Sequence, residues 1–427
     1  QSWIRDLTGL SYGDYWFFEI RSLGGAIIMM SLVLYPYVYL MARAAFLEQS
    51  VSSIEVGCSL GYSRWQALWK LALPMARPAI IAGLSLALME TLADYGTVQY
   101  YGVSTFTTGI FRTFYGYGDT AAAAQLAASL LAFVILLVLL ERYSRRRARY
   151  HSAAESRARA DLIPLSGSKA IMACVICLSP LMFGFIIPAT QLLFWAVFEA
   201  EPLGWDFVGL AWNSFSLAFL AAIIAVILAI ILSYAKRTKP IKPVRTVLAM
   251  AGFGYALPGT IIAIGVLIPL AWLDHRLIDI FGSWGWDSPG LLLSGSLVAL
   301  LFAYTVRFLA VAIGSVQSGL EKVKPSLDQA GRSMGHSPLD ILRKIHVPLM
   351  RSSILTAVLI VFVDVLKELP ATLILRPFNF NTMAVRAYEL ASDERLVDAA
   401  PASIMIVLVG LIPVLMLHAS IARRRPH

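Results

Sequence analysis

Four acidic residues interrupt two apolar stretches of the chain and are the side chains with the clearest chemistry. Glu90 and Asp94 stand four positions apart, and Asp364 and Glu368 repeat that spacing later in the sequence. Residues at i and i+4 share one face of a helix. Because an ionised carboxylate is expensive in hydrocarbon, it normally faces a bundle interior, a wet cavity or a counter-charge. The spacing predicts two acidic faces along a possible substrate path for a hard cation, which prefers oxygen ligands.

A structural role is the alternative for these acids. In that role they cap helices or pair with cations near the ends of membrane spans, and they never touch a substrate. Lys367 and Arg307 are the candidate counter-charges. The six histidines are scattered without a useful pairing distance, and no Ser/His/Asp constellation occurs. We therefore expect no catalytic residue, no bound metal and no enzyme activity in this chain.

The elements that must position the acids are membrane helices. Of the 427 residues, 58% are hydrophobic and 14% are charged, against roughly 25% charged in an ordinary soluble domain. Several apolar runs of about 20 residues are long enough to cross roughly 30 Å of hydrocarbon. The net charge of +9 comes from basic residues between these runs, where they set orientation and do not indicate nucleic acid. Composition predicts an all-α polytopic membrane protein.

We predict nine spans in this chain. They run near 23–46, 79–98, 121–140, 170–198, 212–234, 246–273, 291–316, 352–375 and 400–421. The loops 142–169, 236–245 and 322–351 carry eight, five and six Lys or Arg, whereas 199–211 carries none. Since cytoplasmic loops are rich in Lys and Arg, the basic loops and the carboxyl end are expected in the cytoplasm. Counting back across nine spans places residue 1 on the external side.

Two long parts of the chain match each other at a constant separation, which we call the repeat offset. It pairs Gly57 with Gly331, Gly61 with Gly335, Lys70 with Lys344, Pro74 with Pro348 and Arg112 with Arg386. The later part holds six predicted spans, but only three precede it, and these match its last three. We therefore expect two parallel repeats of six spans, with three amino-terminal spans of the first repeat missing.

This repeat predicts the domain organisation. Residues 1–145 form the carboxyl-terminal half of the first repeat, 146–169 a basic cytoplasmic linker, and 170–427 the second repeat.

Each copy contains a cytoplasmic loop with the same internal spacing, at 50–78 and 318–351. A short helix with small residues, a glycine turn, an amphipathic helix and a proline follow one another in both. The residues concerned are Glu55, Val56, Gly57, Gly61, Leu71 and Pro74, and then Gln329, Ala330, Gly331, Gly335, Ile345 and Pro348. The pattern predicts a projecting knob whose small residues let another protein approach closely. The alternative is an amphipathic helix on the membrane surface, but duplication at one spacing favours docking.

These loops carry a resemblance to a known family. The spacing Glu-Ala-Ala, three residues, Gly, nine residues, Ile-x-Leu-Pro resembles the cytoplasmic signature of permease subunits of binding-protein-dependent ABC importers. Val56 and Gly57 replace the usual alanines, and Gln329 replaces the leading Glu, but the spacing is intact. Two copies in one chain resemble the fused permeases. The segments 95–98, 105–112 and 367–372 resemble the ferric-iron branch, and the likeness covers essentially the whole chain.

The resemblance implies an importer-permease fold and a division of labour. An external or periplasmic binding protein delivers ferric iron, this chain forms the path through the inner (plasma) membrane and its lipid, and two ATPase subunits dock on the two loops as coupling helices. No G-x-x-x-x-G-K-[ST] loop occurs in the sequence, so ATP and Mg²⁺ are expected on the partners and no cofactor on this chain. The alternatives are an importer permease for thiamine or another small solute, and an ion-gradient-driven secondary transporter.

Overall fold

The computed structural model describes residues 9, 19–48, 52–146, 165–202, 204–287 and 290–422, and these form helices and turns without a strand. Most of the expected linker and the expected external position of residue 1 lie outside the described residues. The part up to residue 146 contains α2 (Leu23–Glu48), α3 (Ser52–Ser59), α4 (Arg64–Ala67), the π-helical turn η1 (Leu68–Ala72), α5 (Leu73–Ala93), α6 (Gly96–Tyr100), α7 (Phe106–Phe111), η2 (Arg112–Gly116) and α8 (Thr120–Arg146).

The later part, from residue 165 on, continues with helical segments throughout. They are α9 (Ser168–Leu181), η3 (Met182–Ile186), α10 (Ile187–Phe194), η4 (Trp195–Glu199), α11 (Trp205–Thr238), α12 (Lys242–Ala251), η5 (Gly254–Ala256), α13 (Gly259–Ser283), α14 (Leu297–Glu321), α15 (Pro325–Ser333), α16 (Pro338–Ile341), η6 (Leu342–His346), α17 (Val347–Leu349), α18 (Arg351–Leu366), α19 (Pro370–Leu375), α20 (Met383–Ser392) and α21 (Leu396–Ala422).

Seven of the described helices are long and apolar enough to cross a membrane. An eighth span results if Pro338–Leu349 and Arg351–Leu366, which meet at a bend of 77°, count as one. The prediction of an all-α polytopic membrane protein is therefore confirmed. The ninth predicted span falls on the 27-residue helix α21, and the count of nine stays a prediction.

Three predicted spans are interrupted. The predicted span 79–98 ends as a continuous helix at Ala93, and 352–375 ends at Leu366, each followed by a short separate helix. The predicted span 246–273 is divided between α12 and α13. Its break has a local cause, because Pro258 disfavours the helical conformation of the residue before it, and Leu257 is extended. The breaks place irregular backbone next to the acidic residues.

The core is built from α11, α14 and α18, which pack against one another. Ala221, Ala225 and Ala229 of α11 recur every four residues and are buried. Small side chains along one side of a helix let neighbouring helices approach closely. In lipid, this close packing holds helices together, because no hydrophobic driving force acts between them. In the earlier part, Gly83 of α5 makes the same kind of close contact with α2, since an added Cβ would lie 2.8 Å from the Cα of Val38.

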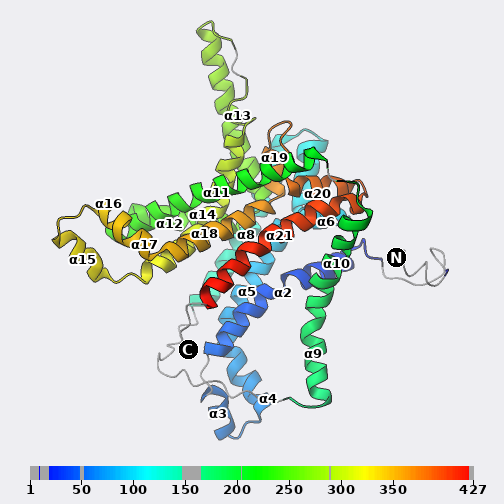
Figure 1. Cartoon of the computed structure of the whole chain (residues 1–427), viewed down its shortest axis with the longest axis vertical. Coiled ribbons are helices and arrows are strands. Elements are labelled where there is room, and N and C mark those ends of the chain that lie inside the picture. Colours follow the sequence, from blue (N-terminus) through cyan, green and yellow to red (C-terminus); the bar gives the residue numbers. More distant parts are fainter. Residues whose placement is uncertain are drawn as a thin grey trace.

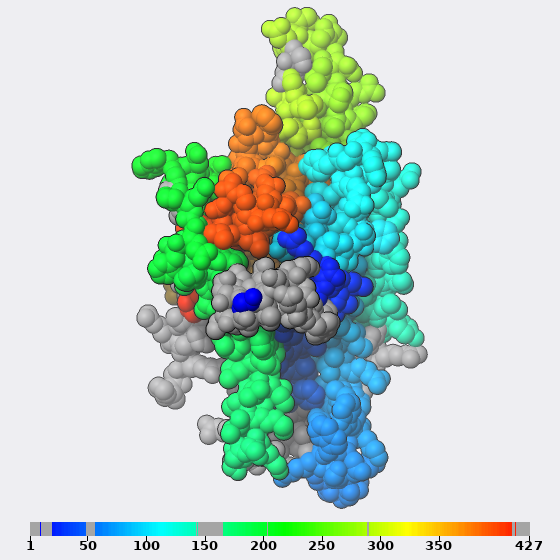
Figure 2. Space-filling model, turned by 90° about the vertical axis from the view of Figure 1, so that its right-hand side faces the viewer, coloured from blue at the N-terminus to red at the C-terminus, as the bar shows by residue number. Residues whose placement is uncertain are grey.

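Several arms project from a central bundle, and α13 stands apart from the rest at the top of the view (Figure 1). The short helices α3 and α4 lie at one corner of the molecule, and α15 and α16 lie at another, whereas α6, α19 and α20 gather together. Figure 2 shows the orange-red surface of α20 beside the cyan surface of the earlier part, with α13 standing above both. At this junction the hydroxyls of Tyr95 and Tyr388 are 2.9 Å apart. The two parts of the chain therefore contact each other at the end remote from α3 and α15.

Candidate functional site

The first predicted knob is a compact helix–turn–helix. Helix α3 ends in a turn at Gly61, whose φ of 84° lies in the left-handed region that favours glycine. The amide of Tyr62 donates to the carbonyl of Gly57, 3.0 Å away, which closes the turn. Ser63 then caps α4, because its hydroxyl accepts from the amide of Gln66 while the Gln66 side chain accepts from the Ser63 amide. The π-helical turn η1 leads directly into α5.

The second knob repeats this structure at the repeat offset. Gly335 has a φ of 78°, and the amide of His336 donates to the carbonyl of Gly331 at 3.1 Å. Ser337 forms the equivalent capping box with Asp340. The π-helical turn η6 follows at the same distance from the glycine as η1 does. Equal spacing in the sequence therefore corresponds to equal local geometry.

The sequence predicts that the small residues of the knobs face a partner. The structure shows that not all of them do. Gly57 and Gly331 are buried. An added Cβ on Gly57 would lie 2.8 Å from the Cβ of Ala67, and one on Gly331 would lie 2.9 Å from Cγ1 of Ile341. These glycines let the first helix of each knob pack against the second. Leu71 and Ile345 are partly buried behind them.

The outward face of each knob is apolar. It consists of three pairs of exposed residues related by the repeat offset, namely Val56 with Ala330, Leu60 with Met334, and Trp65 with Leu339. Gln329 and Pro348 are also exposed, while Pro74 is partly buried. Glu55 belongs to α3, although its side chain is outside the described part. An exposed apolar patch on a short helical element is a surface suited to a protein partner or to a membrane.

Within the described part of the chain, ionic contacts tie the second knob, but not the first, to a long helix. Arg237, at the end of α11, donates through Nε to Oδ2 of Asp328 at 2.8 Å, and through its two terminal nitrogens to the carbonyls of Leu320 and Val323. Nε2 of the buried His346 lies 2.5 Å from Oδ1 of Asp328.

Burial raises the pKa of the Asp328 carboxyl, but the hydrogen bonds from Arg237 and His346 outweigh this effect, so that the pKa lies below its ordinary value. The first knob has Ile54 and Ala72 at the positions equivalent to Asp328 and His346.

The four acids predicted from the sequence meet at one cavity of about 250 Å³. Its wall includes Glu90 in the last turn of α5 and Asp94 directly after that helix, together with Asp364 in the last turn of α18 and Glu368 two residues after its end. The two acidic pairs thus line one cavity at the junction of the two parts. In the sequence, one repeat offset separates Glu90 from Asp364 and Asp94 from Glu368.

Two of the four acids also cap short helices. Asp94 accepts hydrogen bonds from the amide of Val98 and the hydroxyl of Thr97, each at 3.0 Å. Glu368 accepts from the amide of Ala371, also at 3.0 Å. A carboxylate at a helix N-terminus satisfies free amides and interacts favourably with the helix dipole. The capping alternative therefore describes Asp94 and Glu368, whereas no hydrogen bond of this kind is found for the carboxylates of Glu90 and Asp364 among the described residues.

Both expected counter-charges line the same cavity. Arg307 pairs with Glu368 through Nη1 and Oε2, 2.7 Å apart, and both side chains are buried. Gly259 is pressed against this pair, because an added Cβ would collide with the Arg307 guanidinium and the Glu368 carboxylate. Lys367 pairs with Asp364 at 3.1 Å, but its own side chain is 47% exposed. One pair is thus enclosed by the fold, and the other is open.

Sequence reasoning missed the tyrosines around the cavity. Tyr95 and Tyr255 both line it, and Tyr95 is stacked on Phe111 with ring centroids 3.8 Å apart. The position of Tyr95 next to Asp94 was a usable signal. Nothing in the spacing of Tyr255 indicated the cavity, because it comes from the irregular segment between α12 and α13. Among the described residues, no three His, Cys, Asp or Glu side chains are arranged to hold a metal ion.

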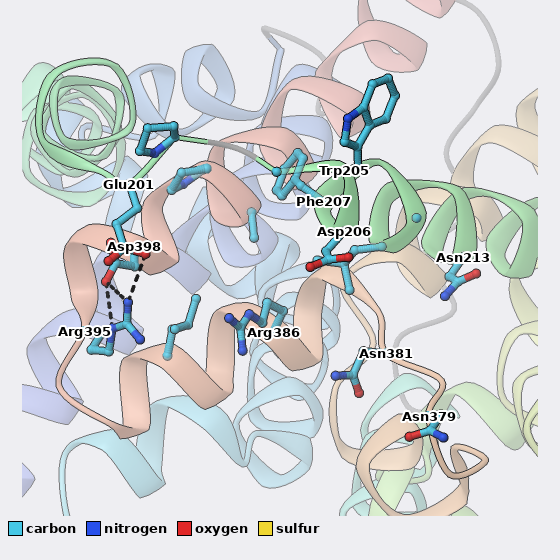
Figure 3. Close-up of a pocket in the computed structure, with 17 residues that line it drawn as sticks. Glu201, Trp205, Asp206, Phe207, Asn213, Asn379, Asn381, Arg386, Arg395 and Asp398 are labelled. Carbon is cyan, nitrogen blue, oxygen red and sulfur yellow. Dashed lines mark hydrogen bonds and ion pairs between the residues drawn. The ribbon is translucent and has the colours of Figure 1, made fainter.

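A larger polar cavity of about 690 Å³ lies between the start of α11, the loop before α20 and the start of α21. Figure 3 shows Arg395 bound to Asp398, with Arg386 below Asp206 and near Asn381. Arg386 is exposed, and it is the repeat equivalent of Arg112 on η2. This cavity shares no lining residue with the acidic cavity, so it is a second, distinct polar surface.

The chain resembles several known proteins. Residues 15–150 and 241–425 match the family model described as "Binding-protein-dependent transport system inner membrane component". The Fe(3+)-transport system permease protein FbpB 2 of Haemophilus influenzae is 26% identical over 405 residues, which are 94% of this chain and 77% of the relative. The molybdenum transport system permease protein ModB of the same species is 27% identical over 134 residues, 31% of this chain and 56% of the relative. A solved bacterial ABC transporter that imports the polysaccharide alginate aligns with 60% of this chain and 96% of its own, at 12% identity and a TM-score of 0.42.

Proposed function

Because the chain belongs to the family of binding-protein-dependent transport system inner membrane components, we propose that it forms the membrane path of an ATP-driven importer for ferric iron. The observation that carries the proposal is that four acidic residues from two equivalent segments line one cavity. Carboxylate oxygens suit a hard, highly charged cation. The similarity to an iron(III) permease over 94% of the chain supports the same substrate.

The two knobs are the proposed docking sites for two separate ATPase subunits. Their equal geometry supports this assignment, because two copies of one ATPase need two equivalent surfaces. The exposed residues Trp65 and Leu339 are the anchors, while Gly57 and Gly331 act indirectly by holding each knob compact. ATP and Mg²⁺ belong to those partners.

An external binding protein is the proposed source of the substrate. It approaches the end of the molecule where α6, α19 and α20 converge (Figure 1). The polar cavity around Arg386 lies at this end and offers hydrogen-bonding groups to a protein surface. In this arrangement the carboxyl end and both knobs face the cytoplasm, which agrees with the basic loops.

The proposed organisation keeps two parallel repeats, with 1–145 from the first, 146–169 as the linker and 170–427 as the second. Matching left-handed glycines, capping boxes and π-helical turns at the repeat offset support it. Helix α14 also begins at Leu297, which is the repeat equivalent of Leu23, where α2 begins. Six spans per repeat would orient both copies alike in the membrane.

Other substrates are the alternatives, since a molybdenum permease is also among the relatives, and thiamine or another small solute fits the same architecture. Two cations, Arg307 and Lys367, line the cavity together with the acids. An anionic solute would use these cations, whereas ferric iron would use the carboxylates. Glu90 and Asp364 therefore distinguish the two classes of substrate.

The test is iron uptake into liposomes that contain the permease, its ATPase and its binding protein. The double variant Glu90→Gln and Asp364→Asn removes two charges and keeps approximate shape. We expect a loss of at least about tenfold in uptake per permease molecule, with normal ATPase association. Asp279→Asn, an exposed acid on α13, is the matched control. Unchanged uptake in the double variant contradicts the path, and uptake that needs an ion gradient and no ATP would instead establish a secondary transporter.

A further inference from the structure

The two cations of the acidic cavity differ in how firmly they are held. Arg307 is buried, pairs with a Glu368 carboxylate that is itself fixed by the amide of Ala371, and is confined by Gly259. A buried pair with this support is expensive to separate. Arg307 is therefore a permanent part of the wall.

Lys367 is held loosely. It directly follows the last residue of α18, its side chain is 47% exposed, and it pairs with Asp364 three positions before it. A partly exposed pair of this kind is weak, because water screens it and the long side chain loses conformational freedom. The ammonium group is compact and sits on a flexible stem, so it can leave Asp364 without a change in the backbone.

Lys367 shares the acidic cavity with acids from both parts of the chain. Glu90, from the other part of the chain, lines the same cavity as Lys367 and Asp364. The repeat equivalent of Lys367 is Ala93. The earlier part thus contributes two acids and no cation at this point, whereas the later part contributes a cation of its own.

We propose that Lys367 is a built-in substitute cation that stands between Asp364 and Glu90 when the path is empty, and that a hard multivalent cation displaces it. This inference rests on the proposed function. Lys367 neutralises acids that would otherwise repel each other across the cavity. It also selects for charge, since a cation of higher charge competes with one ammonium group more effectively than a monovalent ion does.

The test measures cation binding directly, without transport. Terbium(III) is a hard trivalent ion whose luminescence is sensitised by nearby tyrosines, and Tyr95 and Tyr255 line this cavity. It is titrated into the permease in lipid nanodiscs. In Lys367→Met the competing charge is gone, so the half-saturating terbium concentration is expected to fall about threefold or more, as a partly exposed ion pair predicts.

Three further variants separate the explanations. Lys367→Arg keeps a cation and is expected to stay close to wild type. Lys169→Met, which changes an exposed lysine at the start of α9, is expected to have no effect. Adding Glu90→Gln and Asp364→Asn to Lys367→Met is expected to abolish the gain in terbium affinity. That result would show that the gain arises at these two carboxylates.

The outcomes distinguish this inference from the proposed function. If Lys367→Met binds terbium as wild type does, while Glu90→Gln with Asp364→Asn weakens binding, Lys367 is not a competitor and the cation path stands. If the two carboxylate changes have no effect in either background, both ideas fail at this cavity. Weaker terbium binding in Lys367→Met overturns the inference by making Lys367 a support for the site.

Discussion

His346 and Asp328 join the two helical segments of the second knob, with Nε2 of the histidine 2.5 Å from Oδ1 of the aspartate. Arg237 binds the other carboxylate oxygen of Asp328 from α11. The second knob is thus fastened to a core helix, while the first knob has Ile54 and Ala72 at the positions of the aspartate and the histidine. Movement of the second knob must therefore either carry α11 with it or break this network.

The first prediction concerns pH. The folded pKa of Asp328 is depressed, so its stabilising effect is complete above the unfolded value near 3.9 and is lost as pH falls through the folded pKa. Asp328→Asn removes this effect and should weaken the second knob by about 2 kcal/mol at pH 7. Hydrogen exchange of the amides in α15 and α16 measures it. Amides of α3 and α4 serve as an internal control, and equal acceleration in both knobs would contradict a local role.

The second prediction concerns the left-handed glycines. No atom lies within 4 Å of a Cβ added to Gly61 or Gly335, so a substitution acts through the backbone alone. Gly61→Val or Gly335→Val should cost about 1–2 kcal/mol and misplace the following helix. Asn tolerates this backbone region far better and is the control at both positions. Copurified ATPase is the measurement, and similar losses with Val and Asn would assign the glycines to the interface itself.

The third prediction separates docking from membrane contact. Trp65→Glu and Leu339→Glu place a charge on the exposed apolar face of each knob without disturbing its interior. If an ATPase covers this face, we expect at least a tenfold weaker association and an intact helix content. If the face lies on lipid, both variants should keep the ATPase, and Trp65→Glu should shift the fluorescence of Trp69, an exposed neighbour on η1 of the first knob. The two readouts are measured on one preparation.

The fourth prediction concerns the enclosed ion pair. Gly259→Ala forces a methyl group against Arg307 and Glu368, and breaking a buried pair costs roughly 3–5 kcal/mol. The variant should have a lower melting temperature and a lower abundance. Gly265→Ala in the same helix meets no atom within 4 Å and should be neutral or slightly stabilising. A stable Gly259→Ala protein would show that the pair can move aside.

The sequence by itself determined the features that depend on local spacing. Apolar runs predicted the membrane helices, and the repeat offset predicted two equivalent knobs. The left-handed turns at Gly61 and Gly335 follow from glycine and its neighbours, which is why both copies have the same backbone geometry. Helical spacing also predicted that Glu90 and Asp94, and Asp364 and Glu368, share helical faces, but the helices end at Ala93 and Leu366, so Asp94 and Glu368 lie just beyond them.

Only the tertiary structure decided which groups meet. Spacing cannot tell an inward glycine from an outward one, and packing alone places Gly57 against Ala67. Packing also distinguishes the two cations, because Arg307 is enclosed with Glu368 at 2.7 Å, whereas Lys367 is open. The reason is physical. Turns and helical faces depend on neighbours within a few residues, whereas the burial of a charge depends on helices that are distant in the sequence and adjacent in space.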